Sequence, residues 1–208
     1  MAINRYDEID SFYLDVLKEL GSIGSGNAAT ALSSLLDQKI TMMVPQVSVL
    51  ENNAAVARLG GPEKIVAAVL VAFASGIRGL ILSLQSLEYI NVIISNVMGK
   101  TVSDFSELDE IDVSALCEIG NIMISSYVNA ISGMTGMKLD LSPPAISVNM
   151  LGAIMSVPMT EFGYEADKLV LIDGTVMFDN QPVESNLIMM PDISSLNTIL
   201  KMLGVSGG

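Results

Sequence analysis

The sequence predicts an α+β fold in which a largely antiparallel sheet carries two long helices, and in which a unit of helix, strands and helix occurs twice. Two long segments, 10–36 and 108–134, have apolar residues at helical spacing. Short β-branched runs with short connections follow each of them, as is typical of antiparallel sheets. A constant shift of 99 residues aligns the first segment with the second, pairing Glu19 with Glu118 and Gly21 with Gly120. The fold is therefore expected to be pseudo-two-fold.

The first half of the chain reads as a long helix, a strand, a hairpin and a second helix. The hairpin is expected to turn near Ser75 and Gly76, and Gly99 is a stop signal for the second helix. The expected spans are 10–36 for the long helix, 40–49 for the strand around Pro45, 66–73 and 80–84 for the hairpin, and 86–98 for the second helix.

The second half repeats this order. Gly133 and Gly136 are expected to end its long helix, and Gly204 follows its last helix. The expected spans are 108–134 for the long helix, strands from 145 around Val148 and at 154–158, 168–173 and 186–190, and 193–203 for the last helix. We expect one domain over residues 1–208, built from internal repeats at about 10–100 and 109–208, because no long linker separates the halves.

Composition excludes several kinds of site. The chain has no histidine and one cysteine, Cys117, so a Cys/His zinc site, a Ser-His-Asp triad and an internal disulfide are impossible. Ten basic against 23 acidic residues give a net charge of −13 without any Lys/Arg cluster. This charge argues against nucleic acid or anionic lipid as a partner.

Half of the residues are hydrophobic, which raises the question of a membrane span. The run 65–77 lies between Lys64 and Arg78, and it is shorter than the roughly 20 residues that a spanning helix needs. The N-terminal residues show no apolar signal-peptide region. We therefore expect no membrane insertion and a cytoplasmic location.

The two long helices share one pattern of polar residues. On a helical wheel, Ser114, Asn121, Ser125 and Asn129 lie within about 60° of Glu118 and form one polar stripe. The opposite side is expected to be buried and carries Val113, Leu116, Gly120, Met123, Tyr127 and Ile131. The shared pattern is an acidic or hydroxyl residue, Glu four residues later, Asn or a substitute three residues after that, and a proline 23 residues further on. Its two copies are Asp15, Glu19, Ser22 and Pro45, and Ser114, Glu118, Asn121 and Pro144.

With this duplicated pattern the sequence resembles the CheC-type phosphatases of bacterial and archaeal chemotaxis, a group that includes CheX and the N-terminal part of FliY. The family motif is similar to Asp/Ser-x3-Glu-x2-Asn-x22-Pro. The second copy matches it at all four positions, and the first departs only at Ser22. The resemblance covers essentially the whole chain.

The resemblance implies removal of the phosphoryl group from the aspartyl phosphate of a CheY-like response regulator. Asn121 would position the attacking water, and Glu118 would bind the receiver's lysine. Mg²⁺ would be carried by the receiver, so no cofactor or metal of the chain's own is expected. Ser114 would support the helix or the contact surface, and Pro144 would set loop or edge-strand geometry. Asp15 and Pro45 are the equivalent supporting residues of the first copy.

The Glu19 site is expected to be weak or silent, because Ser22 has no amide. The alternative is a non-catalytic interaction scaffold. The resemblance implies CheD, a receptor-modifying deamidase, as a candidate partner, and the flagellar switch protein FliM has a similar middle domain without the Glu/Asn pair. The intact pair at Glu118 and Asn121 argues against a pure scaffold.

Overall fold

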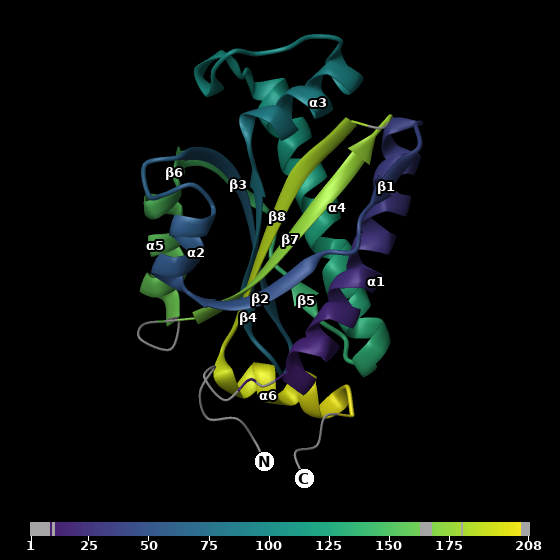
Figure 1. Ribbon diagram of the computed structural model, residues 1–208, viewed down its shortest axis with the longest axis vertical. Helices are drawn as coiled ribbons and strands as arrows, with labels where there is room; N and C mark the ends of the chain where they lie inside the picture. Colours follow the sequence, from purple (N-terminus) through teal and green to yellow (C-terminus); the bar gives the residue numbers. More distant parts are fainter. Residues whose placement is uncertain (1–8, 10, 163–167, 180, 205–208) are drawn as a thin grey trace.

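The computed structural model describes residue 9 and residues 11–162, 168–179 and 181–204. Within these residues the fold consists of helices packed on an antiparallel sheet, which confirms the predicted α+β class (Figure 1). The helices are α1 Ser11–Leu36, α2 Asn52–Arg58, α3 Leu87–Met98, a 3₁₀ turn Phe105–Glu107, α4 Glu110–Thr135, α5 Leu151–Phe162 and α6 Ile193–Met202. The strands are β1 Ile40–Met42, β2 Gln46–Glu51, β3 Ile65–Ala74, β4 Gly79–Gln85, β5 Asp140–Leu141, β6 Ala145–Met150, β7 Lys168–Phe178 and β8 Gln181–Pro191.

The sheet interleaves the two halves of the chain. Its order is β1-β7-β8-β4-β3-β5, with β2 also paired to β7 and β6 also paired to β3. Every pairing among the described strands is antiparallel. The strands that follow α1 thus complete the sheet against the hairpin of the second half, and the strands that follow α4 pair with the hairpin of the first half. Each half therefore depends on the other for its hydrogen bonds.

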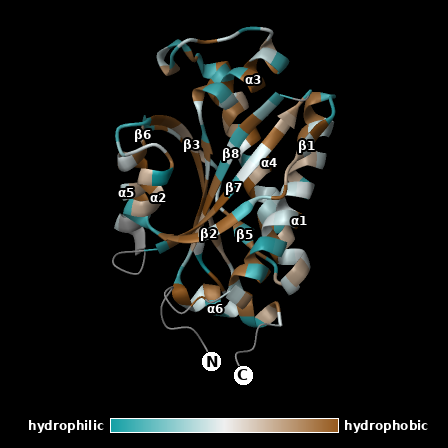
Figure 2. Ribbon diagram, viewed as in Figure 1, coloured by the Kyte–Doolittle hydropathy of each residue, from teal (hydrophilic) through white to brown (hydrophobic). Residues whose placement is uncertain are grey.

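The two faces of the sheet have separate hydrophobic cores. One core lies between the sheet and the long helices α1 and α4, and includes Leu17, Leu116 and Ile131. The other lies under α2 and α5, and includes Ala55 and Leu151. Figure 1 shows α1 and α4 side by side at the right and α2 with α5 at the left. In Figure 2, α1 is mostly pale, because Gly, Ser, Ala and Thr fill much of it.

The long helices have the predicted bounds to within two residues. Asp109 caps α4 by accepting from the backbone N–H groups of Ile111 and Asp112, and the Asp112 side chain accepts from the N–H of Asp109. Gly136 ends α4 with φ at 71°, a left-handed conformation that favours glycine. Gly133 lies inside α4 and does not end it.

The predicted strand at 154–158 is wrong, because these residues belong to α5. Leu151, Ile154, Met155 and Pro158 are all buried, and their spacing of three and four residues places them on one side of a helix. The sequence prediction took Pro158 as the end of a strand, although the structure has it inside the helix. The short helix α2 was not predicted, and β7 and β8 are longer than the predicted strands.

Among the described residues, α4 is the helix whose length and composition would suffice to cross a membrane. Half of its most apolar window is buried within the fold, against the sheet and α1. Packing of a core helix accounts for this apolar composition.

Candidate active site

The polar stripe predicted on the second long helix is present on α4. Glu118 and Ser114 are exposed, and Asn121 is half-buried one turn beyond Glu118. Leu116, Met123, Tyr127 and Ile131 are buried on the other side, as the wheel predicted, whereas Val113 is only half-buried. Glu118 and Asn121 make no side-chain hydrogen bond or ion pair with any other residue that the structure describes. Their polar groups are therefore available to a ligand or to a partner.

A glycine between these two residues brings α4 close to the sheet. A Cβ built on Gly120 would lie 2.4 Å from Cγ2 of Val69 in β3 and 3.1 Å from Nε2 of Gln85 in β4. The Gln85 amide, fully buried, donates to the carbonyl oxygen of Leu116 over 3.0 Å. The sheet thus fixes the depth of α4 at the level of Glu118. The helical wheel predicted that Gly120 lies on the buried face, but it did not predict the contacts with Val69 and Gln85.

An ion-pair cluster holds the N-terminal end of α4. Lys100 Nζ lies 2.9 Å from Asp109 Oδ2 and 2.8 Å from Asp112 Oδ2, and the Asp112 side chain is fully buried. Hydrogen bonds to Asp112 and Asp109 raise the pKa of Lys100. The hydrogen bond from Lys100, with one from the Asp112 backbone, lowers the pKa of Asp109. This cluster orients the first turn of the helix that carries the stripe.

The equivalent residues of α1 are placed similarly but differ in their contacts. Glu19 is exposed, and the Ser22 hydroxyl donates to the Lys18 carbonyl oxygen over 3.0 Å within the same helix. Asp15 forms an exposed ion pair with Lys18 at 2.8 Å. Ser22 thus uses its only hydrogen-bond donor on its own helix. The lysine that precedes Glu19 in the sequence pairs with Asp15.

The residue equivalent to Lys18 under the 99-residue shift is Cys117. Partial burial and the charge of Glu118 raise the pKa of the Cys117 thiol. A neutral thiol is a poor nucleophile, so the structure gives no reason to assign Cys117 a chemical role.

The prolines of the two copies take different positions. Pro45 is buried between β1 and β2, and a Cβ built on Gly21 would lie 3.3 Å from its Cγ. Pro144 is half-buried just before the edge strand β6. Both therefore lie in connections to strands at the margins of the sheet. Ser114 donates to the carbonyl oxygen of Glu110 in its own helix at 2.9 Å.

The structure does not bring the two candidate sites together. Helices α1 and α4 run in opposite directions (Figure 1), and they meet where the Ser25 hydroxyl and the Tyr127 hydroxyl lie 2.8 Å apart. A Cβ on Gly24 would lie 2.5 Å from the Tyr127 ring, so glycine allows this close approach. Glu19 and Glu118 precede the two contact residues on their own helices. At a rise of about 1.5 Å per residue they are therefore about 22 Å apart along the helix axes.

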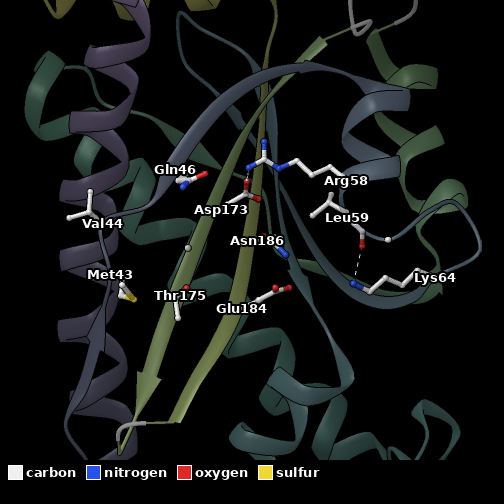
Figure 3. A pocket seen from close by; sticks show the side chains of 12 residues that line it. Met43, Val44, Gln46, Arg58, Leu59, Lys64, Asp173, Thr175, Glu184 and Asn186 are labelled. Carbon is white, nitrogen blue, oxygen red and sulfur yellow. Dashed lines mark hydrogen bonds and ion pairs between the residues drawn. The ribbon is translucent and has the colours of Figure 1, made fainter.

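A hollow of about 500 Å³ lies on the opposite face of the sheet from α1 and α4 (Figure 3). Arg58 of α2 pairs there with Asp173 of β7 at 2.5 Å, and Lys64 donates to the Leu59 carbonyl oxygen. Burial raises the pKa of Asp173, and the charge of Arg58 opposes this. None of the predicted site residues lines this hollow. Among the described residues, no group of three or more Cys, Asp or Glu side chains is arranged to hold a metal ion.

The chain is thus an α+β protein in which two long helices pack on an antiparallel sheet, and one of these helices carries a carboxylate and an amide on its accessible side. The CheC-like family model matches residues 12–49 and 111–148, two segments that start 99 residues apart. The chain is 30% identical over 206 residues to the CheY-P phosphatase CheC of Bacillus subtilis, covering 97% of this chain and 98% of that one. The chain therefore belongs to the CheC-like family.

Two further similarities extend this comparison. The flagellar motor switch phosphatase FliY of Bacillus subtilis is 30% identical over 149 residues, which cover 70% of this chain and 38% of FliY. The crystal structure of Thermotoga maritima FliY matches with a TM-score of 0.74 at 23% identity, covering 95% of this chain and 98% of that one. This second likeness shows a shared fold.

Proposed function

We propose that this chain is a chemotaxis phosphatase that hydrolyses the aspartyl phosphate of a CheY-like response regulator at the Glu118 and Asn121 site. Membership of the CheC-like family and the whole-length similarity to a CheY-P phosphatase support the reaction class. The observation that carries the assignment of the site is the position of Glu118 and Asn121, one turn apart on an accessible helix face and without a side-chain partner among the described residues.

Asn121 would orient the attacking water. Its amide can accept one hydrogen bond from the water and donate another, and as a neutral group it does not repel the anionic phosphoryl oxygens. The water oxygen attacks phosphorus in line with the bond to the receiver's aspartate, and that bond breaks. Inorganic phosphate leaves with both protons of the water, and the aspartate remains on the receiver as a free carboxylate. Asn121 contributes positioning rather than covalent chemistry.

Glu118 would fix the docking of the receiver. A receiver holds Mg²⁺ and a lysine around its phosphoryl group, so the carboxylate of Glu118 would bind that ammonium by a charge-assisted hydrogen bond. The three-residue spacing from Glu118 then sets where Asn121 lies relative to phosphorus. Gly120, Val69 and Gln85 hold both residues at a fixed height above the sheet.

The site on α1 would contribute little. Ser22 donates its hydroxyl hydrogen to Lys18 of its own helix, which leaves only an acceptor for a water. One active site per chain is therefore expected, on α4.

The test is the dephosphorylation rate of Mg²⁺-loaded, phosphorylated CheY with the wild type, Asn121→Ala and Ser22→Ala. Removal of the positioning amide should lower the rate about 100-fold, and Ser22→Ala, the matched change in the other copy, should leave it unchanged. The assay is run with and without CheD. An inactive wild type under both conditions would refute the phosphatase and leave the interaction scaffold, whereas equal losses in both variants would refute the one-site assignment.

A further inference from the structure

Each copy of the pattern has an exposed apolar side chain at its N-terminal end. Ile111 in the first turn of α4 is 66% exposed, and Phe12 in the first turn of α1 is 59% exposed. Each lies seven residues before the glutamate of its copy, and the two are related by the same shift of 99 residues. Single exposed apolar residues are common on protein surfaces. Their repetition at one position of both copies distinguishes this pair.

Ile111 continues the stripe that carries the proposed site. Seven residues of an α-helix turn through 20° less than two full turns and rise about 10 Å, so Ile111 lies almost in line with Glu118 on the same side of α4. Ser114 lies between them. The stripe thus presents, in order from the N-terminus, an apolar group, a hydroxyl, a carboxylate and an amide.

Folding alone does not account for isoleucine at this position. Two thirds of the side chain remain in water, so its burial contributes little to the hydrophobic core. A β-branched residue is also a poorer helix former than alanine. The side chain becomes useful where another molecule covers it.

We propose that Ile111 is an apolar anchor by which α4 binds the CheY-like receiver beside its phosphorylation site. This inference rests on the proposed function and adds a contact that the Asp/Ser, Glu, Asn and Pro pattern does not contain. The occupant is a receiver surface that has an anionic phosphoryl group and a lysine facing Glu118 and Asn121, with an apolar side chain about 10 Å further along the helix.

The size of a protein interface places Ile111 inside the contact and Phe12 outside it. A stable interface covers about 800 Å² on each partner, which is a patch of about 16 Å radius. Ile111 is about 10 Å from Glu118 along α4. The helices α1 and α4 are antiparallel and meet at Ser25 and Tyr127. Phe12 lies 13 residues before Ser25, and Glu118 lies nine residues before Tyr127, so the two separations add along the axes. Phe12 is therefore about 33 Å from Glu118. Phe12 is therefore a matched control.

The experiment measures binding and turnover separately. CheY of the source organism, carrying Mg²⁺ and beryllofluoride on its phospho-acceptor aspartate, is titrated with the wild type, Ile111→Ala and Phe12→Ala, and kcat and KM are measured with phosphorylated CheY. Ile111→Ala should weaken Kd about tenfold, since a few buried aliphatic carbons are worth about that much. It should raise KM with kcat unchanged. Phe12→Ala should leave Kd within about twofold of the wild type.

Each outcome separates this inference from the proposed function. An active wild type for which Ile111→Ala keeps its Kd within twofold overturns the anchor and leaves the phosphatase intact. Equal weakening by Phe12→Ala also overturns it, because the contact would then not be local to the Glu118 site. A wild type that neither binds nor dephosphorylates CheY overturns the proposed function itself. Thermal unfolding of Ile111→Ala should be no lower than that of the wild type, because the side chain is exposed and alanine is the better helix former.

Discussion

Replacing Gly120 by alanine tests whether the distance between α4 and the sheet sets the position of the Glu118 and Asn121 side chains. The added Cβ would lie 2.4 Å from Cγ2 and 2.6 Å from Cβ of Val69, about 1 Å short of ordinary van der Waals contact. Val69 is fully buried in the middle of β3, so it has no room to move aside. The helix must then rise from the sheet, and it carries Glu118 and Asn121 with it.

The change in unfolding free energy is the sum of two opposing contributions. Overpacking a core position costs about 1–3 kcal/mol, and alanine is a better helix residue than glycine by about 1 kcal/mol. The net loss in unfolding free energy should therefore be at most about 2 kcal/mol. A displacement of about 1 Å should lower the phosphatase rate about 100-fold. Urea unfolding and the CheY dephosphorylation assay measure the two effects.

Gly133→Ala in the same helix is the control. No atom lies within 4 Å of a Cβ at Gly133, so this change should stabilise the protein by about 0.5–1 kcal/mol and leave the rate unchanged. A Gly120→Ala protein as stable and as active as the wild type would refute the reasoning. A Gly120→Ala protein that is destabilised but fully active would show that the height of α4 above the sheet does not set the position of Asn121.

Two further predictions concern contacts that hold the long helices. Tyr127→Phe should lower the unfolding free energy by about 1 kcal/mol, because the buried Ser25 hydroxyl loses its partner. The Ser25→Ala, Tyr127→Phe double variant should lose less unfolding free energy than the sum of the two single variants. Additive losses would contradict the contact. Lys100→Met should lower the urea midpoint at pH 7 by leaving Asp112 without its ion-pair partner. Lys100 lowers the pKa of Asp109 in the folded state. The stability from this ion pair is therefore fully present above the unfolded pKa of Asp109, about 3.9, and is lost as pH falls from there through the lower folded pKa. The difference in urea midpoint between Lys100→Met and the wild type should shrink towards pH 3. A midpoint difference that is unchanged at pH 3 would contradict this linkage.

The elements that local signals define were predictable from sequence. Asp109 and Gly136 bound α4 by capping and by a left-handed residue, which are properties of a few consecutive residues. Gly99 ends α3 in the same way, with φ at 68°. The wheel also placed Glu118 and Asn121 correctly on the accessible side of α4, because the period of a helix is fixed.

Features that depend on distant residues were not predictable in this way. The pairing of β2 with β7 and of β6 with β3 joins segments about 80 or more residues apart, and strand order is not encoded in local periodicity. The error at 154–158 arose because a short apolar run suits a strand or a buried helix equally well. The contact of Gly120 with Val69 likewise needed the packing of α4 on β3, although the glycine shared by both copies was a visible signal.

The difference between the two copies follows from which residues the fold needs. In α1, a Cβ built on Gly21 would lie 3.1 Å from Cγ2 of Val47 and 3.3 Å from Cγ of Pro45. The helix covers part of a sheet whose strands β1 and β2 hydrogen-bond to β7 of the other half. Ser22, in contrast, bonds only to the carbonyl oxygen of its own helix, so exchanging an amide for a hydroxyl there costs the fold little. The glycine and proline of the pattern therefore contact the sheet or the strands at its margins in both copies, whereas the amide that we propose positions water makes no side-chain hydrogen bond among the described residues. On this reasoning Ser22→Asn should leave the urea midpoint close to that of the wild type, and any gain in CheY dephosphorylation that survives Asn121→Ala would measure how much of a second site the contacts around Glu19 still support.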